Sequence, residues 1–196
     1  MYHEQPIPNN ELEVIIIAST TEHCLYTSAY DPDKISSPDC FSQSTETSGL
    51  VPHENVPEPI HADCDNCPYN QFGSAGKGKR CKEYRKLIMI PADTQAEDVP
   101  QAEMAYMKVS PTSIKNWRKY VQQLTASAGI PPWAAKTKVK VVPDKKTIHQ
   151  ITFTGVEPIE DESILAAVHG RIEEGEERLL QPYTYDDEDA EDSDKY

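Results

Sequence analysis

The sequence predicts a mainly β fold with helical additions, and three observations support this. The segment Glu11 to Ser19 (ELEVIIIAS) is rich in β-branched residues, which is typical of a buried strand that opens a fold. Two segments that alternate polar and apolar residues indicate a hairpin around Pro143-Asp144-Lys145-Lys146, namely Lys136 to Val142 and Thr147 to Val156. A single strong helical periodicity runs from Pro111 to Ala128.

Shorter elements complete this expected fold. Lys86 to Pro91 and Ala102 to Ser110 are further expected strands, while Asp31 to Pro59 has five prolines and almost no periodicity. The central helix is expected to be capped by Ser110 and to bury one face, made of Ile114, Trp117, Tyr120, Val121 and Leu124. A second helix, broken or kinked near Gly170 and Gly175, is expected over Asp161 to Leu180. This strand count fits a five-stranded oligonucleotide-binding barrel, with a β-sandwich or an α+β sheet as alternatives.

Length and composition favour one domain with irregular decoration. The chain has 196 residues, and its longest apolar run, Val14 to Ala18, is far below the roughly 20 residues that span a bilayer. The first residues lack the basic and apolar pattern of a secretory signal, so we expect a cytoplasmic protein without membrane contact. The expected organisation is a barrel domain over 1–182, with an inserted module over 38–86, and a disordered tail over 183–196.

The net charge of -14 is distributed in three blocks of different sign. Residues 1–76 sum to -11, residues 77–154 to +9 and residues 155–196 to -12. A basic middle between acidic ends predicts a surface that binds a polyanion, and a merely solvated basic face is the alternative. Within the middle block, strand alternation puts three lysines on one face of the expected hairpin: Lys136, Lys138 and Lys140.

Four cysteines predict a structural zinc site. Cys64 and Cys67 form a C-x-x-C pair, Cys81 follows, and Cys40 lies upstream in the Pro-rich segment. Four thiolates suit tetrahedral Zn²⁺, and metal binding would order a segment that has few core residues of its own. His61 competes with Cys40 for the fourth position, and a redox role for the C-x-x-C pair is the alternative.

The loop after the C-x-x-C pair is basic and carries aromatic residues. Gly73 to Lys79 satisfies G-x-x-x-x-G-K, but Arg80 replaces the Ser or Thr that binds Mg²⁺, and no strand precedes the loop. Basic side chains that bind phosphates and aromatic rings that stack on bases predict a contact with single-stranded nucleic acid. The residues concerned are Tyr69, Phe72, Lys77, Lys79, Arg80, Lys82, Tyr84, Arg85 and Lys86. Packing around the zinc module is the alternative for the three aromatic residues.

The sequence contains no catalytic motif, and its C-terminal segment is acidic. The six histidines are scattered, and no nucleophile–base motif is present, so no enzyme is expected. The C-terminal segment is too acidic and too poor in apolar residues to fold alone. Its expected partner-binding residues are Asp186, Asp187, Glu188, Asp189, Glu191, Asp192 and Tyr196.

The cysteine set, the basic aromatic loop, the lysine hairpin and the acidic tail together resemble the single-stranded DNA-binding proteins of tailed bacteriophages. The resemblance is one of architecture. Some members of that family use a histidine as the first metal ligand, where this sequence has Cys40. It implies a non-catalytic protein that coats single-stranded DNA during replication, recombination and repair in the cytoplasm of the bacterial host. It also implies an acidic tail that recruits a polymerase, helicase or primase and competes with DNA, and self-association is a further expectation.

Two other functions remain open at this point. A zinc-ribbon adaptor would bind a host or phage protein, such as RNA polymerase, through the acidic blocks. An acidic DNA mimic that inhibits a nuclease would explain the charge of -14 but not the basic middle.

Overall fold

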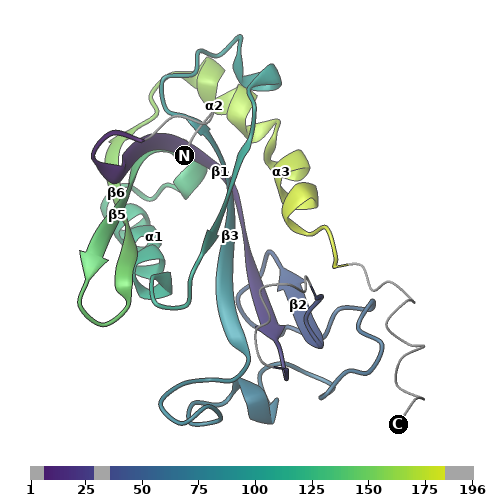
Figure 1. Ribbon diagram of the computed structural model, residues 1–196. Coiled ribbons are helices and arrows are strands. Elements are labelled where there is room, and N and C mark those ends of the chain that lie inside the picture. Colours follow the sequence, from purple (N-terminus) through teal and green to yellow (C-terminus); the bar gives the residue numbers. More distant parts are fainter. Residues whose placement is uncertain (1–6, 29–35, 184–196) are drawn as a thin grey trace, which may run out of the picture. The chain divides into compact units, whose positions relative to one another are not determined.

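The chain forms two compact units in a computed structural model, which describes residues 7–28 and 36–183 (Figure 1). The first unit combines residues 7–21 with residues 83–180. The second unit combines residues 22–28 and 36–82 with residues 181–183. Most of the predicted 38–86 module therefore belongs to the second unit.

Six strands form one open antiparallel sheet. Its path is β4-β3-β1-β5-β6, and β2 pairs with β1 beside this path. The described strands have two outer edges, β4 and β6, and do not close into a barrel. The strands are β1 (Glu11–Leu25), β2 (Cys40–Ser44), β3 (Lys82–Pro91), β4 (Ala105–Val109), β5 (Ala135–Asp144) and β6 (Ile148–Pro158). The sequence predicted all of these strands except β2, whose Pro-rich surroundings carry no periodicity.

Both faces of the central strands are buried, which produces two cores in the first unit. Val14 and Ile16 of β1 join Leu87 and Met89 of β3 in a core that contains Trp117. Neighbouring residues on the same strands point to the other face and form a second core. That second core contains Ile15, Ile17, Ala18, Ile88, Ile90, Val99, Ile159, Val168 and Leu179.

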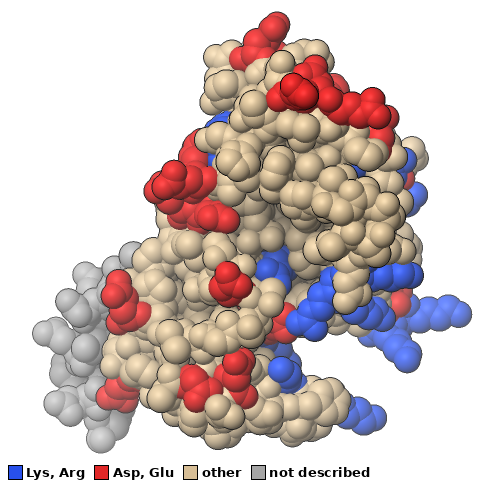
Figure 2. All heavy atoms as spheres, turned by 180° about the vertical axis from the view of Figure 1, so that it is seen from behind, with Lys and Arg blue, Asp and Glu red and all other residues tan. Residues whose placement is uncertain are grey.

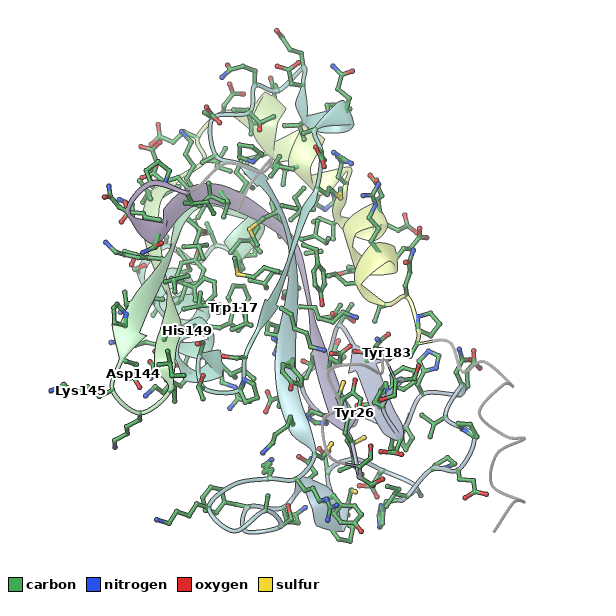
Figure 3. All side chains as sticks on the ribbon, in the orientation of Figure 1. Tyr26, Trp117, Asp144, Lys145, His149 and Tyr183 are labelled. Atoms are coloured by element: carbon green, nitrogen blue, oxygen red, sulfur yellow. The ribbon has the colours of Figure 1, made fainter. Side chains whose placement is uncertain are left out.

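The helix α1 (Ile114–Ala128) covers the first core. Four residues of its predicted apolar stripe are buried and Val121 is partly buried, with Trp117 lying between the helix and the strands (Figure 3). The start of the helix differs from the prediction, because Ser110 does not cap it. Ser113 occupies the cap position, but its hydroxyl accepts the Ile151 amide of β6 at 2.9 Å instead of capping a helix amide. The helix ends at Gly129, whose φ of 65° lies in the left-handed region that glycine tolerates.

Two short helices, α2 (Glu162–His169) and α3 (Ile172–Leu179), cover the second core. The break between them falls at Gly170, as predicted, and Asp161 caps α2 by accepting the Ser163 and Ile164 amides. Gly175 lies within α3 and allows a close approach, since a Cβ there would lie 3.0 Å from the Cβ of Ala18. Short 3₁₀ helices complete the fold at Pro8–Asn10, Pro68–Asn70, Val99–Gln101 and Pro132–Ala134.

A buried arginine joins these helices to the loop before β4. Arg171 donates through Nη1 to the carbonyl oxygens of Val99 (2.8 Å) and Ala102 (2.7 Å), and through Nε to Glu174. Arg178 also pairs with Glu174, but its side chain is half exposed. The two arginines therefore share one carboxylate and differ in burial.

We expect Arg171→Met to lower the free energy of unfolding by about 2–4 kcal/mol, because it leaves the Val99 and Ala102 carbonyls without their donor and removes the more buried of the two partners of Glu174. Arg178→Met is the matched control and should cost less than about 1 kcal/mol, as exposed ion pairs do. Urea unfolding followed by tryptophan fluorescence measures both, since Trp117 and Trp133 lie in the first unit. Equal losses in the two variants would contradict this assignment.

Candidate nucleic-acid interface and cysteine cavity

Two tyrosines and two lysines share one face of β3 and β4, and we call them the tyrosine–lysine array: Tyr84 and Lys86 on β3, Tyr106 and Lys108 on β4. Lys86 lies directly opposite Lys108, and Ile88 lies opposite Tyr106. Because alternate residues of a strand point to the same face, this register brings all four side chains to one face. Two of the four, Tyr106 and Lys108, were not among the predicted site residues.

The array combines an exposed aromatic ring with concentrated positive charge. Tyr106 is 56% exposed, whereas Lys86 is only 6% exposed. The Lys108 ammonium group lies 4.3 Å from the centre of the Tyr84 ring, a cation–π contact that holds both side chains in place. The edge strand β4 therefore presents an ordered platform of ring and charge.

A second group of basic side chains surrounds α1 and the β5–β6 turn. In Figure 2, Lys and Arg side chains gather on the side of the molecule where these elements lie. The exposed residues there are Lys115, Arg118, Lys119, Lys145 and Lys146, and Lys145 extends away from the hairpin turn (Figure 3).

The predicted basic face of β5 is largely neutralised by neighbouring carboxylates. Lys138 pairs with Glu11 (2.9 Å) and Glu13 (3.4 Å), and Lys140 pairs with Glu11 (3.1 Å). Lys136 in turn pairs with Glu157 of β6 at 2.7 Å. The hydrogen bonds from Lys138 and Lys140 hold the pKa of Glu11 below its usual value, so the carboxylate stays charged. The three lysines alternate along the strand as predicted, but their charge is shared with acidic side chains.

The basic loop of the second unit is folded on itself. The amides of Gly73 and Ala75 both donate to the Gly78 carbonyl, and the Gly76 amide donates to the Gly73 carbonyl. These amides are not directed towards a phosphate, which agrees with the departure of this loop from a P-loop sequence.

The predicted contact residues of this loop differ in their surroundings. Lys79 donates to Asn70 at 3.0 Å, Arg80 lies over the Tyr69 ring at 5.5 Å, and Lys82 donates to the Lys79 carbonyl. Phe72, by contrast, is 79% exposed, and Lys77, five residues later, is also exposed. These two residues can reach a ligand without breaking a contact in the described structure.

All four predicted zinc ligands line one small cavity in the second unit. Cys40, Cys64, Cys67 and Cys81 surround a space of about 20 Å³, and His61 lines the same space. All four are free thiols. Asn70 fixes the C-x-x-C turn. Its side-chain amide donates to the Cys64 carbonyl at 2.7 Å, and its backbone amide donates to the Cys67 carbonyl at 2.9 Å.

The thiols are close to one another but are not arranged as metal ligands. Burial raises the pKa of the Cys40, Cys64 and Cys81 thiols, that of Cys81 to about 12, and the neighbouring thiols add to each rise. Within residues 7–28 and 36–183, no group of three or more His, Cys, Asp or Glu side chains has the geometry to hold a metal ion. The structure thus brings the predicted donors to one cavity without setting a coordination geometry.

Tyr183 contacts the second unit just before the acidic tail. Its hydroxyl donates to Glu22 at 3.1 Å and lies 3.7 Å from the Cys24 sulfur, while its ring meets Phe41 edge-on at 4.9 Å. Burial, together with the neighbouring Cys24 and Glu22 groups, raises the pKa of Tyr183. Figure 3 labels Tyr183 and also Tyr26, which is 43% exposed. The predicted partner-binding residues Asp186 to Tyr196 lie outside the described residues.

No family model, no curated protein sequence and no solved structure matches this chain. Among the helices of the described residues, none has the length and apolar character needed to cross a membrane.

We expect Tyr183→Phe to increase the alkylation rate of Cys24, which is 1% exposed, by about five- to tenfold. The reason is that local opening of the second unit becomes easier by roughly the 1 kcal/mol that a buried hydrogen bond contributes. Peptide mass spectrometry after timed iodoacetamide labelling resolves Cys24 from the other thiols. Tyr26→Phe is the control, and a Tyr183→Phe rate equal to that of the control would show that the hydroxyl contributes no stability.

Proposed function

We propose that this protein binds single-stranded DNA without catalysis and coats it during phage DNA replication, recombination and repair, in the cytoplasm of the bacterial host. The observation that carries the proposal is the tyrosine–lysine array of β3 and β4. It pairs the two side-chain chemistries that single-stranded nucleic acid requires, namely rings for base stacking and ammonium groups for phosphates.

The position of the array also favours a single strand over a duplex. Tyr106 is 56% exposed on an edge strand, where an unpaired base can reach the ring. In a duplex the bases are already stacked, so the ring would gain no such contact. The oligonucleotide-binding fold predicted from the sequence belongs to this proposal. The described sheet is open and not a closed barrel, and the support is the five-strand path with α1 against one face.

Zinc belongs to the same proposal as a structural cofactor. Four thiols and one imidazole line a single small cavity, and thiolates and imidazole are the donors that Zn²⁺ prefers, which supports this part of the proposal. Cys40, Cys64, Cys67 and Cys81 would hold the metal, with His61 as the competitor of Cys40. The metal would supply folding free energy to residues 40–81, which the structure describes in full and in which β2 is the one strand.

The acidic tail completes the proposed function as the site that recruits replication proteins. Its carboxylates repeat over a short segment that the sequence marks as unable to fold alone. Tyr183, the last residue that the structure describes before this segment, contacts Glu22 and Phe41.

The proposal is tested by fluorescence-anisotropy titration of a labelled dT oligonucleotide, a matched duplex and a matched single-stranded RNA, at low and moderate salt. We expect tight, salt-sensitive binding to the single strand and much weaker binding to the duplex. Absence of binding to all three would contradict the proposal. It would favour the alternative function, a zinc-ribbon adaptor that binds a host or phage protein through its acidic surfaces.

Variants of the array test where the strand binds. Tyr106→Ala should weaken binding by about 1–3 kcal/mol through lost stacking, and Lys108→Gln should lower the salt slope by about 0.7. Lys138→Gln is the matched control, because it removes the same charge from a lysine that Glu11 and Glu13 already neutralise. If Lys138→Gln weakens binding as much as Lys108→Gln does, the array is not the interface.

Metal analysis tests the zinc site. We expect about one zinc per chain in protein purified without chelators, and loss of both zinc and cooperative unfolding in Cys64→Ser. Cys24→Ser is the control and should retain the metal, because Cys24 does not line the cavity. A comparison of Cys40→Ser with His61→Ala decides the fourth ligand. A metal-free wild-type protein that keeps its fold would exclude structural zinc.

A further inference from the structure

Arg85 is a buried cation whose Nε atom has no acceptor among the described residues. It lies on β3 opposite Val109, the last residue of β4, and only 4% of it is exposed. Its Nε atom is fully buried and makes no hydrogen bond to residues 7–28 or 36–183. Arg85 shares the face of Leu87 and Met89, so it lies on the opposite side of β3 from Lys86.

The charged groups near Arg85 do not neutralise it. Glu83 lies two residues away on the same face, but its carboxylate accepts a hydrogen bond from Arg118 of α1. Burial lowers the pKa of Arg85, the Glu83 charge raises it in part, and the Arg118 charge lowers it. The cluster therefore holds two guanidinium groups and one carboxylate, with a net positive charge.

Buried hydroxyl groups of the adjacent strand are also without partners. Thr20 and Thr21 of β1 are at most 1% exposed, and the Oγ1 atom of each makes no hydrogen bond. Both threonines lie on β1, the strand that neighbours β3 in the sheet. Because successive side chains alternate, one of the two hydroxyls lies on the face of Arg85.

A folded chain rarely keeps such a group without a ligand. Removing a guanidinium group from water without an acceptor costs several kcal/mol, and buried charges are normally paired. A hydrophobic side chain of similar size would give a more stable sheet here. Arginine, however, offers a planar fork of donors that matches the oxygens of a phosphate.

We propose that Arg85, together with Arg118 and a threonine hydroxyl of β1, forms a binding site for a phosphate group on the α1-facing side of β3. The ligand is the phosphodiester of a bound strand or free inorganic phosphate, which share this chemistry. The first source rests on the proposed function, and the second does not. In both cases the guanidinium fork of Arg85 supplies the central contact.

The first arm of the test uses inorganic phosphate. The melting temperature of the full chain is measured against phosphate concentration at constant ionic strength, for wild type, Arg85→Met, Arg85→Lys and the control Arg178→Met. We expect phosphate to raise the melting temperature of wild type and of the control but not that of Arg85→Met, with a smaller rise for Arg85→Lys. Without phosphate, Arg85→Met should melt at or above the wild-type temperature, because it removes an unpaired buried charge.

The second arm uses the dT oligonucleotide. Arg85→Met should reduce the affinity about five- to tenfold at low salt and lower the salt slope by about 0.7, as expected for the loss of one phosphate contact on a single strand. Arg178→Met should leave both unchanged. An effect in this arm alone assigns the site to the phosphodiester, and an effect in the first arm alone assigns it to free phosphate and separates it from DNA binding.

The two proposals can fail separately. If wild type binds the oligonucleotide while Arg85→Met behaves as wild type in both arms, the phosphate site is overturned and the proposed function stands. If the oligonucleotide does not bind but phosphate stabilises the protein through Arg85, the phosphate site stands and the proposed function is overturned.

Discussion

Burial of β1 and β3 on both faces is the constraint on which the first unit depends. Residues 14–18 of β1 are all buried, and so are Leu87 to Ile90 of β3. Each strand therefore needs cover on two sides, which α1 provides on one face and α2 and α3 provide on the other. Each Å² of apolar surface that is removed from water contributes roughly 25 cal/mol. Because these strands bury apolar side chains on both sides, they are a main source of stability.

The same two strands change character along their length. In β3 the apolar run begins at Leu87, and the residues before it are charged or aromatic. The polar end places Lys86 on one face and Arg85 on the other, so each face of one strand continues from a hydrophobic core into a basic site. The cores thus hold in place the side chains to which both proposals assign binding. A rigid strand is a better support for such groups than a loop, because its backbone is fixed by neighbours on both sides.

Local patterns predicted much of the first unit. The stripe that includes Trp117 and Leu124, the hairpin turn at Asp144 and the break at Gly170 each depend on residues close in sequence, and the structure contains all three. The predicted cap of α1 was wrong. Ser113 occupies the cap position, and its hydroxyl accepts a hydrogen bond from the Ile151 amide of β6, a partner that its sequence neighbours do not reveal.

Pairing between distant residues escaped prediction. Lys140 and Glu11 are 129 positions apart, and their ion pair exists only because β5 lies beside β1. For the same reason the array was predicted only in half. Tyr106 and Lys108 alternate within their own segment, but nothing in the sequence aligns them with Lys86 until the register of β3 and β4 is known. The cysteines were easier, since two of them are three residues apart, and the cavity gathers the four predicted positions.

The short edge strand β4 has a consequence for solubility. An exposed strand edge can pair with the edge of another molecule and start aggregation, and proteins oppose this with short edge strands and with lysine side chains on them. β4 is five residues long and carries Lys108 near its end. The charge that we assign to phosphate binding would then also keep neighbouring copies from joining their sheets. A neutral residue at this position would leave the protein more prone to form insoluble assemblies at high protein concentration.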